Sequence, residues 1–186
     1  VEHAELTETL MLFRQIGASK YNCFSPSSAG NLSNYKKGVL VVDQTKGDAA
    51  LKYGGINESD FDRMLNDAIQ ENPDLPIYVR AHPDHIHRSQ HSCFSEQSLN
   101  HPRVKILPPS ITPQDCFEFC ETIYVGTSLL GMEALIQGKK VHTYGWPFYS
   151  GWGLTEDKSS FEKPIRKNQL SIEQLFATSY MRYCLY

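Results

Sequence analysis

Residues 122–155, TIYVGTSLLGMEALIQGKKVHTYGWPFYSGWGLT, contain the pattern that decides the fold. The apolar run at 123–125 is typical of a buried strand, and the turn GTS at 126–128 leads into apolar residues at helical spacing. Gly138 is suited to end that helix, and a second strand follows over 140–144. A strand, a helix and a second strand in this order predict a βαβ unit, whose two strands are parallel.

Thr127 and Ser128 lie at the start of the predicted helix, which we expect to begin at Ser128. A helix start offers free backbone N–H groups and the positive end of the helix dipole, and this one adds two hydroxyls. Such a set of groups suits a phosphate. Serine and threonine are also common at helix starts as caps, so the motif by itself leaves a phosphate site and a purely structural cap open.

The composition of the 186-residue chain is that of one globular domain, with 40% hydrophobic and 21% charged residues. A net charge of −3 argues against a nucleic-acid partner, which normally requires a basic surface. The five cysteines form no CxxC pair and suggest no disulfide framework, which favours a reducing cytoplasm. No run approaches the ~20 apolar residues of a membrane helix, and no signal peptide is recognisable. We expect a cytoplasmic chain, and its ends at Val1 and Tyr186 are typical of a fragment.

Predicted strands and helices alternate along the chain. A continuous apolar run predicts a strand at about 39–43, and further short segments predict strands at about 77–80, 104–107, 122–125 and 140–144. Helical periodicity predicts further helices over 4–16, 58–70, 114–120 and 171–183. The alternation predicts an α/β fold, a Rossmann-like doubly wound parallel sheet with helices on both faces. We expect residues 1–37 to be a helix and linker left from a preceding lobe, and 38–186 to be the domain itself.

Three polar segments follow predicted strands. With the strand order 3-2-1-4-5, the loops after the first and fourth strands flank the switch point, where ligands bind in sheets of this kind. Gln44–Asp48 lies on one side of that crevice and Thr127–Ser128 on the other. The segment Arg80–Pro83 opens on the same edge. We therefore expect three motifs that are distant in sequence to meet around one ligand.

Asp48 is the main candidate for a catalytic carboxylate, because it lies in a polar loop at this crevice and can act as a nucleophile or general base. The structural alternative is a turn in which the carboxylate bonds to nearby backbone. Asp43 competes for the role, although a strand-end Asp more often bonds to its neighbours. Gln44 is expected to hold the reacting carboxylate or a sugar hydroxyl, unless it is an ordinary surface residue.

Arg80 and His82 are candidate phosphate ligands, since both donate hydrogen bonds and Pro83 fixes the turn after the strand. The alternative is a strand end with no ligand. A metal site is also conceivable because histidine is the commonest metal ligand, and it would use His82, His85, His87, His91 and Cys93. The carboxylates of a known metal motif are missing, so we expect no metal.

Glu133 lies one turn inside the predicted helix, where its carboxylate is placed to accept hydrogen bonds from a ribose. The alternative is an exposed glutamate on the helix surface. The loop 146–153 is rich in aromatic residues and glycine, and Gly151 and Trp152 belong to it. Such a loop suits the wall of a base or sugar site, or equally the packing of a core beneath a long loop.

These segments resemble the capsule polysaccharide biosynthesis family of KpsC/LipB-type β-Kdo transferases. The resemblance covers about residues 19–186. The matching segments are SKYN (19–22), VLVVDQTKGDAALKYGG (39–55), HPD (82–84), TSLLGMEALIQGKKVHTYG (127–145), PFYSGWGLTED (147–157) and SIEQLFATSYMRY (171–183). DQTKGD and PFYSGWGLT together are specific, whereas HP alone is not.

The resemblance implies a bacterial glycosyltransferase of GT-B type. Such enzymes transfer 3-deoxy-D-manno-oct-2-ulosonic acid (Kdo) from CMP-Kdo, with retention, to a lipid-linked glycan that anchors the capsule. The family pattern Gln-x-x-x-Asp falls on Gln44 and Asp48 and makes Asp48 the nucleophile. His82, Thr127 and Ser128 would contact the CMP phosphate. Arg80 stands where the family normally has lysine, which keeps the positive charge.

The family assignment also implies partners and a place in the cell. No cofactor is implied besides the donor substrate CMP-Kdo. The implied partners are the CMP-sugar, the lipid-linked glycan and other capsule biosynthesis or export proteins. The implied location is the cytoplasm, at most peripheral to the inner face of the inner membrane.

The main departure from the family pattern is length. A GT-B enzyme has two Rossmann-like lobes, but the first predicted strand here already begins near residue 39. The chain would therefore be the nucleotide-binding half, without the lobe that holds the acceptor. Two functions stay open: a transferase or its donor-binding half, and a non-catalytic nucleotide-sugar-binding or capsule-export accessory domain.

Overall fold

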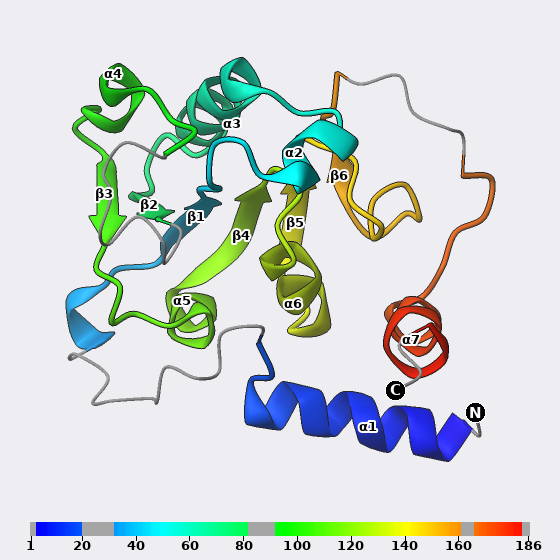
Figure 1. Ribbon diagram of the computed structural model, residues 1–186. Coiled ribbons are helices and arrows are strands. Elements are labelled where there is room, and N and C mark those ends of the chain that lie inside the picture. The colour runs from blue at the N-terminus through cyan, green and yellow to red at the C-terminus, as the bar shows by residue number, and fades with distance from the viewer. Residues whose placement is uncertain (1–2, 20–31, 82–91, 161–165, 184–186) are drawn as a thin grey trace.

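The centre of the molecule is a six-stranded parallel sheet in the order β3-β2-β1-β4-β5-β6 (Figure 1). The structure is a computed structural model that describes residues 3–19, 32–81, 92–160 and 166–183. The strands are β1 Gly38–Val42, β2 Ile77–Arg80, β3 Val104–Leu107, β4 Cys120–Val125, β5 Lys140–Thr143 and β6 Glu156–Asp157. The first five strands have the order 3-2-1-4-5 used in the sequence analysis. Strand β6 adds a two-residue edge strand that the sequence did not predict.

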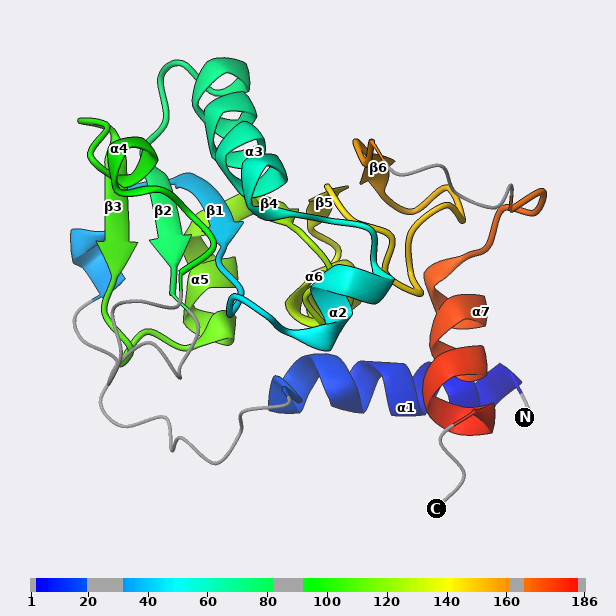
Figure 2. The same cartoon turned by 45° about the horizontal axis from the view of Figure 1, so that its top comes forward.

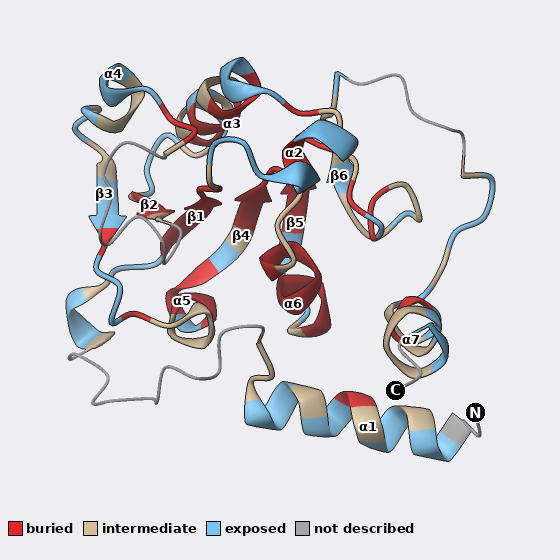
Figure 3. Ribbon diagram, viewed as in Figure 1, coloured by how far each residue is buried: buried red, intermediate tan, exposed pale blue. Residues whose placement is uncertain are grey.

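Helices cover both faces of this sheet, which is why the central strands are apolar without interruption. In β1 all five residues are buried, and successive side chains enter different cores. Leu40 and Val42 pack into one core, and Val39 and Val41 pack into the other. Figure 3 shows this burial along β1, β4 and β5, in contrast to the exposed edge strand β3. The Rossmann-like α/β class predicted from the alternation is confirmed.

The helices are α1 His3–Ile16, α2 Ala49–Tyr53, α3 Glu58–Glu71, α4 Glu96–Leu99, α5 Pro113–Phe119, α6 Leu130–Ile136 and α7 Ile172–Phe176. A π-helical segment, Ala177–Arg182, continues α7. Local signals explain the helix starts: α3, α5 and α7 each begin with a capping box, formed by Asn57 with Asp60, by Thr112 with Asp115 and by Ser171 with Gln174. The short helices α2 and α4 were not predicted, because five or four residues carry too little periodicity.

Helix α1 packs against the C-terminal helix and the end of α6 (Figure 2). Its Leu10 is buried, and the Phe13 ring lies 4.9 Å from the Phe176 ring in an edge contact. Arg14 Nε donates to the carbonyl of Ile136 at 2.6 Å, which joins the end of α1 to the end of α6. Helix α1 therefore shares the core of the domain, while its origin in a preceding lobe stays a prediction.

The described cysteines are structural. Cys93, Cys116 and Cys120 are free thiols in the buried core. Burial raises the pKa of Cys93 and of Cys116 to about 12, which keeps both thiols uncharged at neutral pH. Cys116 and Cys120 are therefore small residues of the core, whereas Cys23 and Cys184 lie outside the described residues. None of the described helices has the length and apolar character required to cross a bilayer.

Candidate functional site

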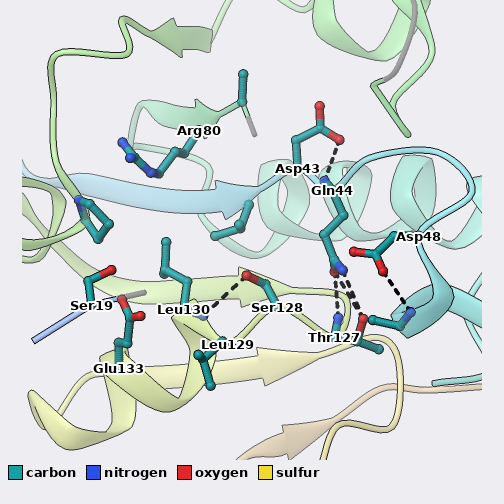
Figure 4. Close-up of a pocket in the computed structure, with 14 residues that line it drawn as sticks. Ser19, Asp43, Gln44, Asp48, Arg80, Thr127, Ser128, Leu129, Leu130 and Glu133 are labelled. Carbon is teal, nitrogen blue, oxygen red and sulfur yellow. Dashed lines mark hydrogen bonds between the residues drawn. The ribbon is translucent and has the colours of Figure 1, made fainter. Parts of the chain in front are cut away.

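A pocket of about 270 Å³ opens where β1, β2 and β4 end (Figure 4). This is the switch point of the sheet, since β1 and β4 are neighbours whose helices lie on opposite faces. The pocket is lined by Ser19, Val42, Asp43, Gln44, Asp48, Ala50, Arg80, Ala81, Pro113, Thr127, Ser128, Leu129, Leu130 and Glu133. Six of the ten predicted site residues are in this set, namely Gln44, Asp48, Arg80, Thr127, Ser128 and Glu133.

Gln44 fixes the loop after β4 to the loop after β1. Its side chain is buried, and its Oε1 accepts from the backbone N–H of Thr127 at 2.7 Å. Its Nε2 donates to Thr127 Oγ1 at 3.0 Å, so both ends of the amide bond to one residue. The surface alternative for Gln44 is therefore wrong. Gln44 bridges the two loops that the strand order brought together.

The methyl group of Thr127 fits against two glycines. A Cβ atom on Gly54 would lie 2.2 Å from Thr127 Cγ2, and one on Gly145 would lie 2.4 Å from it. These distances are shorter than any ordinary contact, so only glycine fits at either position. The backbone N–H of Trp146 also donates to the carbonyl of Gly54 at 2.8 Å. Thr127 is thus held from three directions, by Gln44, by the end of α2 and by the loop after β5.

Asp48 is the N-cap of α2, and its Oδ1 accepts from the backbone N–H of Ala50 at 2.9 Å. The structural alternative, a carboxylate that bonds to nearby backbone, is confirmed, and it does not exclude the catalytic role. The cap bond uses one carboxylate oxygen, and the residue is exposed at the pocket. The role of Asp48 in chemistry stays a prediction.

Asp43 is buried behind the pocket, and its bonds are structural. Its Oδ1 accepts from the backbone N–H of Gln44 at 2.8 Å and from that of Cys93 at 3.0 Å. This is the bonding expected of an aspartate at a strand end. Asp43 therefore orders the start of the loop that carries Gln44, and it ties that loop to the segment at Cys93.

The helix after β4 begins later than predicted. Helix α6 starts at Leu130, its N-cap Leu129 makes no side-chain cap, and Ser128 Oγ accepts from the backbone N–H of Leu130 at 3.3 Å. The prediction of a start at Ser128 is wrong, because Thr127 bonds to Gln44 instead and the residues just before Leu130 form a turn. Thr127 and Ser128 still line the pocket, as part of a loop.

Glu133 faces the pocket from α6. Its relative exposure is 8%, so the alternative of an exposed surface glutamate is wrong. Ser19, which follows α1, lines the same pocket (Figure 4). The sequence reading missed Ser19 because it lies in a stretch rich in Ser, Asn and Gly that looked like a linker. The available signal was the segment SKYN, which carries part of the family resemblance.

Arg80 ends β2 and brings a positive charge to the pocket. Its Nη1 donates to the carbonyl of Ile111, which orients the guanidinium while other N–H groups stay available. Two further candidates of this segment, His82 and Pro83, lie outside the described residues, as do His85, His87 and His91. No metal-binding group of three or more ligands is found among the residues that the structure describes.

Gly151 and Trp152 do not line the pocket. The backbone N–H of Gly151 donates to Asp157 at 2.9 Å, and Trp152 Nε1 donates to the carbonyl of Phe148 at 2.8 Å. The Arg166 guanidinium lies 4.5 Å from the Trp152 ring. Within this loop Tyr149 is fully buried and its hydroxyl donates to the carbonyl of Ser128. The aromatic loop therefore supports the pocket from behind, and ligand contacts by Gly151 and Trp152 stay a prediction.

A Rossmann-like domain with a polar pocket at its switch point is the architecture of nucleotide- and nucleotide-sugar-binding α/β proteins. The family model that matches residues 12–186 is described as "Capsule polysaccharide biosynthesis protein". The chain belongs to this capsule polysaccharide biosynthesis family.

Two curated relatives are similar in sequence. The capsule polysaccharide modification protein LipA of Neisseria meningitidis serogroup A is 36% identical over 152 residues, which cover 80% of this chain and 21% of LipA. The lipopolysaccharide-processing protein LpsZ of Rhizobium meliloti is 34% identical over 194 residues, which cover 99% of this chain and 43% of LpsZ. The chain therefore spans less than half the length of either relative.

Two solved structures share the fold. The KpsC β-Kdo 2,4 transferase of Thermosulfurimonas dismutans superposes with a TM-score of 0.80 at 35% identity, over 97% of this chain and 56% of that one. The KpsC β-Kdo 2,7 transferase of the same organism gives a TM-score of 0.65 at 27% identity, over 95% of this chain and 53% of the other. The predicted fold, one lobe of a GT-B-type transferase, is confirmed.

Proposed function

We propose that the chain is the donor-binding half of a retaining β-Kdo transferase that uses CMP-Kdo in capsule polysaccharide biosynthesis. The observation that carries the proposal is the pocket at the switch point, where Gln44, Asp48 and Thr127 meet. Family membership and the likeness to two structures titled Kdo transferases support the choice of sugar. The acceptor is a lipid-linked glycan, supplied together with the remaining lobe.

The donor phosphate lies against the loop after β4 and the end of β2. Thr127 and Ser128 contribute hydroxyls there, and Arg80 contributes a cation. His82 and Pro83 lie outside the described residues, and only the sequence pattern and the family resemblance assign them to the same phosphate site. Glu133 accepts from the ribose hydroxyls, because its carboxylate faces the pocket from α6. No metal or other cofactor takes part in binding.

The chemistry assigned to Asp48 is a double displacement. Its carboxylate attacks the anomeric carbon of Kdo, and the bond from that carbon to the CMP phosphate breaks, which releases CMP. An acceptor hydroxyl then loses its proton to solvent, attacks the same carbon and displaces the Asp48 carboxylate, so the configuration is retained. Gln44 holds the loop that carries Asp48 in register with Thr127, and so aligns the nucleophile with the donor.

A second function, a non-catalytic nucleotide-sugar-binding or capsule-export accessory domain, is favoured by one observation. Asp48 already caps α2, which is a sufficient structural reason for an aspartate at this position. An accessory domain would bind CMP without turnover, and would associate with other capsule biosynthesis or export proteins.

Asp48→Asn and Asp48→Ala separate the two functions. Asparagine caps a helix as well as aspartate but cannot attack the anomeric carbon, whereas alanine loses both properties. CMP binding by calorimetry and Kdo transfer to a glycolipid acceptor are measured for each variant, with the acceptor-holding lobe supplied. A transferase loses transfer in both variants and keeps CMP binding, at least in Asp48→Asn. Kdo transfer that survives in Asp48→Asn contradicts the role of Asp48 as nucleophile. Wild-type protein that binds CMP but transfers no Kdo contradicts the proposal that the chain is part of a transferase.

A further inference from the structure

Tyr53 is the last residue of α2 and the most exposed aromatic side chain near the pocket. Its relative exposure is 80%, although a phenol ring of this size usually gains stability by burial. The residue before it, Lys52, places its ammonium 5.9 Å from the ring centroid, at the outer limit of a cation–π contact. Such a weak contact leaves the ring open to a ligand.

The geometry of α2 puts Tyr53 on the side of the pocket. Ala50 lines the pocket, and Tyr53 follows it by three residues. Residues three apart on a helix lie on one face, with Cβ atoms about 5–6 Å apart. Leu51 points the other way and is buried in the core against α3 and the sheet. Tyr53 does not line the pocket itself, but it lies on the same face of α2 as Ala50 and on the side away from Leu51, just beyond the rim.

The ring is also carried on a fixed support. The start of α2 is capped by Asp48, and Gly54 just beyond its end lies against the Thr127 methyl group. The carbonyl of Gly54 accepts from the backbone N–H of Trp146 at 2.8 Å. Both ends of this five-residue helix are therefore tied to residues around the pocket. A rigid aromatic ring gives contact area at a small entropic cost, which suits it to recognition.

We propose that Tyr53 is a substrate-binding residue that stacks on a sugar ring of the glycan at the rim of the pocket. The proposal rests on the proposed function, since it needs a sugar next to Asp48. A pyranose has an apolar face of C–H bonds that packs on an aromatic ring, while its hydroxyls remain in water. Tyr53 then selects for a sugar at this position and takes no part in holding the nucleotide.

The test is equilibrium binding of two probes by calorimetry, CMP and a soluble Kdo-terminated oligosaccharide, measured with the acceptor-holding lobe supplied. In Tyr53→Ala the oligosaccharide should bind about tenfold more weakly, while CMP binds as in the wild type. Tyr53→Phe keeps the ring and should retain wild-type affinity for both probes. Tyr183→Ala is the matched control, because Tyr183 is 88% exposed in the segment after α7 and should affect neither probe.

Three outcomes overturn the proposal. The first is oligosaccharide binding by Tyr53→Ala that is as tight as that of the wild type, and the second is loss of CMP binding in the same variant. The third is a wild-type protein that binds CMP but fails to bind the oligosaccharide. This result contradicts the proposed role of Tyr53 and leaves the proposed donor site unaffected. A wild-type chain that does not bind CMP contradicts the proposed function instead. Because Tyr53 is exposed, its variants should fold, which thermal denaturation checks.

Discussion

Gln44 connects the loops after β1 and β4 through a single side chain. It lies 83 positions before Thr127 in the chain, yet both polar ends of its amide bond to that residue. Sequence reasoning placed Gln44 at the crevice from the strand order alone. It could not specify the partner, because the pairing of an amide with one backbone N–H depends on the spacing of β1 and β4.

Gln44→Leu should lower the free energy of unfolding by about 1–2 kcal/mol, because the partly buried N–H of Thr127 loses its partner. CMP should bind more weakly as well, since the loop that carries Thr127 is released. Chemical denaturation and calorimetry measure the two effects. The control Gln70→Leu replaces an exposed glutamine of α3 and should change the unfolding free energy by less than about 0.5 kcal/mol. Equal stability of Gln44→Leu and wild type would show that the two bonds contribute nothing.

Among the elements, α2 and β5 show how short segments position the pocket. Helix α2 has five residues and was not predicted, yet it carries Asp48 at its start and ends against Thr127. Strand β5 was predicted as the second strand of the βαβ unit, but its residue His142 is buried and lies close to the charged groups of Glu156 and Glu71. Both features depend on neighbours from other parts of the chain, which periodicity does not reveal.

Gly54→Ala should destabilise the protein by about 1–3 kcal/mol, because the added methyl group would overlap Thr127 Cγ2 and the carbonyl of Ala50. CMP affinity should fall as Thr127 is displaced. In a Thr127→Ser background, which removes the methyl group and keeps the hydroxyl, part of this loss should be relieved. A double-mutant cycle measured by chemical denaturation gives the coupling. Additive changes in the free energy of unfolding would mean that the residues at positions 54 and 127 do not interact sterically.

His142 should make the stability depend on pH. Burial lowers its pKa below the ordinary value of 6.5, and neither ring nitrogen has a hydrogen-bond partner in the described part of the chain. Its ring stacks on Tyr124, and Nδ1 lies 3.4 Å from Glu156 and 3.9 Å from Glu71. Those carboxylates favour the protonated form, and the nearby Lys140 and Lys158 oppose it, but burial is the largest effect.

Because the unfolded chain binds this proton at a higher pH than the folded one, stability is complete above about pH 6.5 and declines as the pH falls below it. His142→Phe keeps the stacking and removes the titration. Denaturation at pH 7.5 and 5.5 should therefore show a smaller loss for the variant than for the wild type. An equal loss in both proteins would exclude His142 as the cause.

At the scale of the whole molecule, α1 and the C-terminal helix pack against each other and against the core that contains Leu10 and Phe176. Phe13 lies against both Phe176 and Tyr180, with ring centroids 4.9 and 5.5 Å away. Residues near the two ends of the described chain therefore stabilise one core. The sequence predicted both helices by their periodicity, and only the tertiary structure pairs them.

Phe13→Ala should lower the free energy of unfolding by about 2–4 kcal/mol, because it removes both aromatic contacts and leaves a cavity. Leu12→Ala is the matched control on the same helix. Leu12 is 51% exposed, so its loss should cost less than about 0.5 kcal/mol. Thermal and chemical denaturation compare the two variants. A similar effect of both would mean that α1 does not share the core.

The sequence by itself determined the class of fold and, with the strand order taken as 3-2-1-4-5, the edge of the sheet where the pocket opens. These follow from local patterns, since buried parallel strands must be apolar and the carboxyl ends of such strands meet at one edge. Only the tertiary structure decided that Gln44 bonds to Thr127, that Asp48 caps α2 and that Ser19 reaches the pocket. Those outcomes depend on distances between segments far apart in the chain, and hydrophobic periodicity contains no information about such distances.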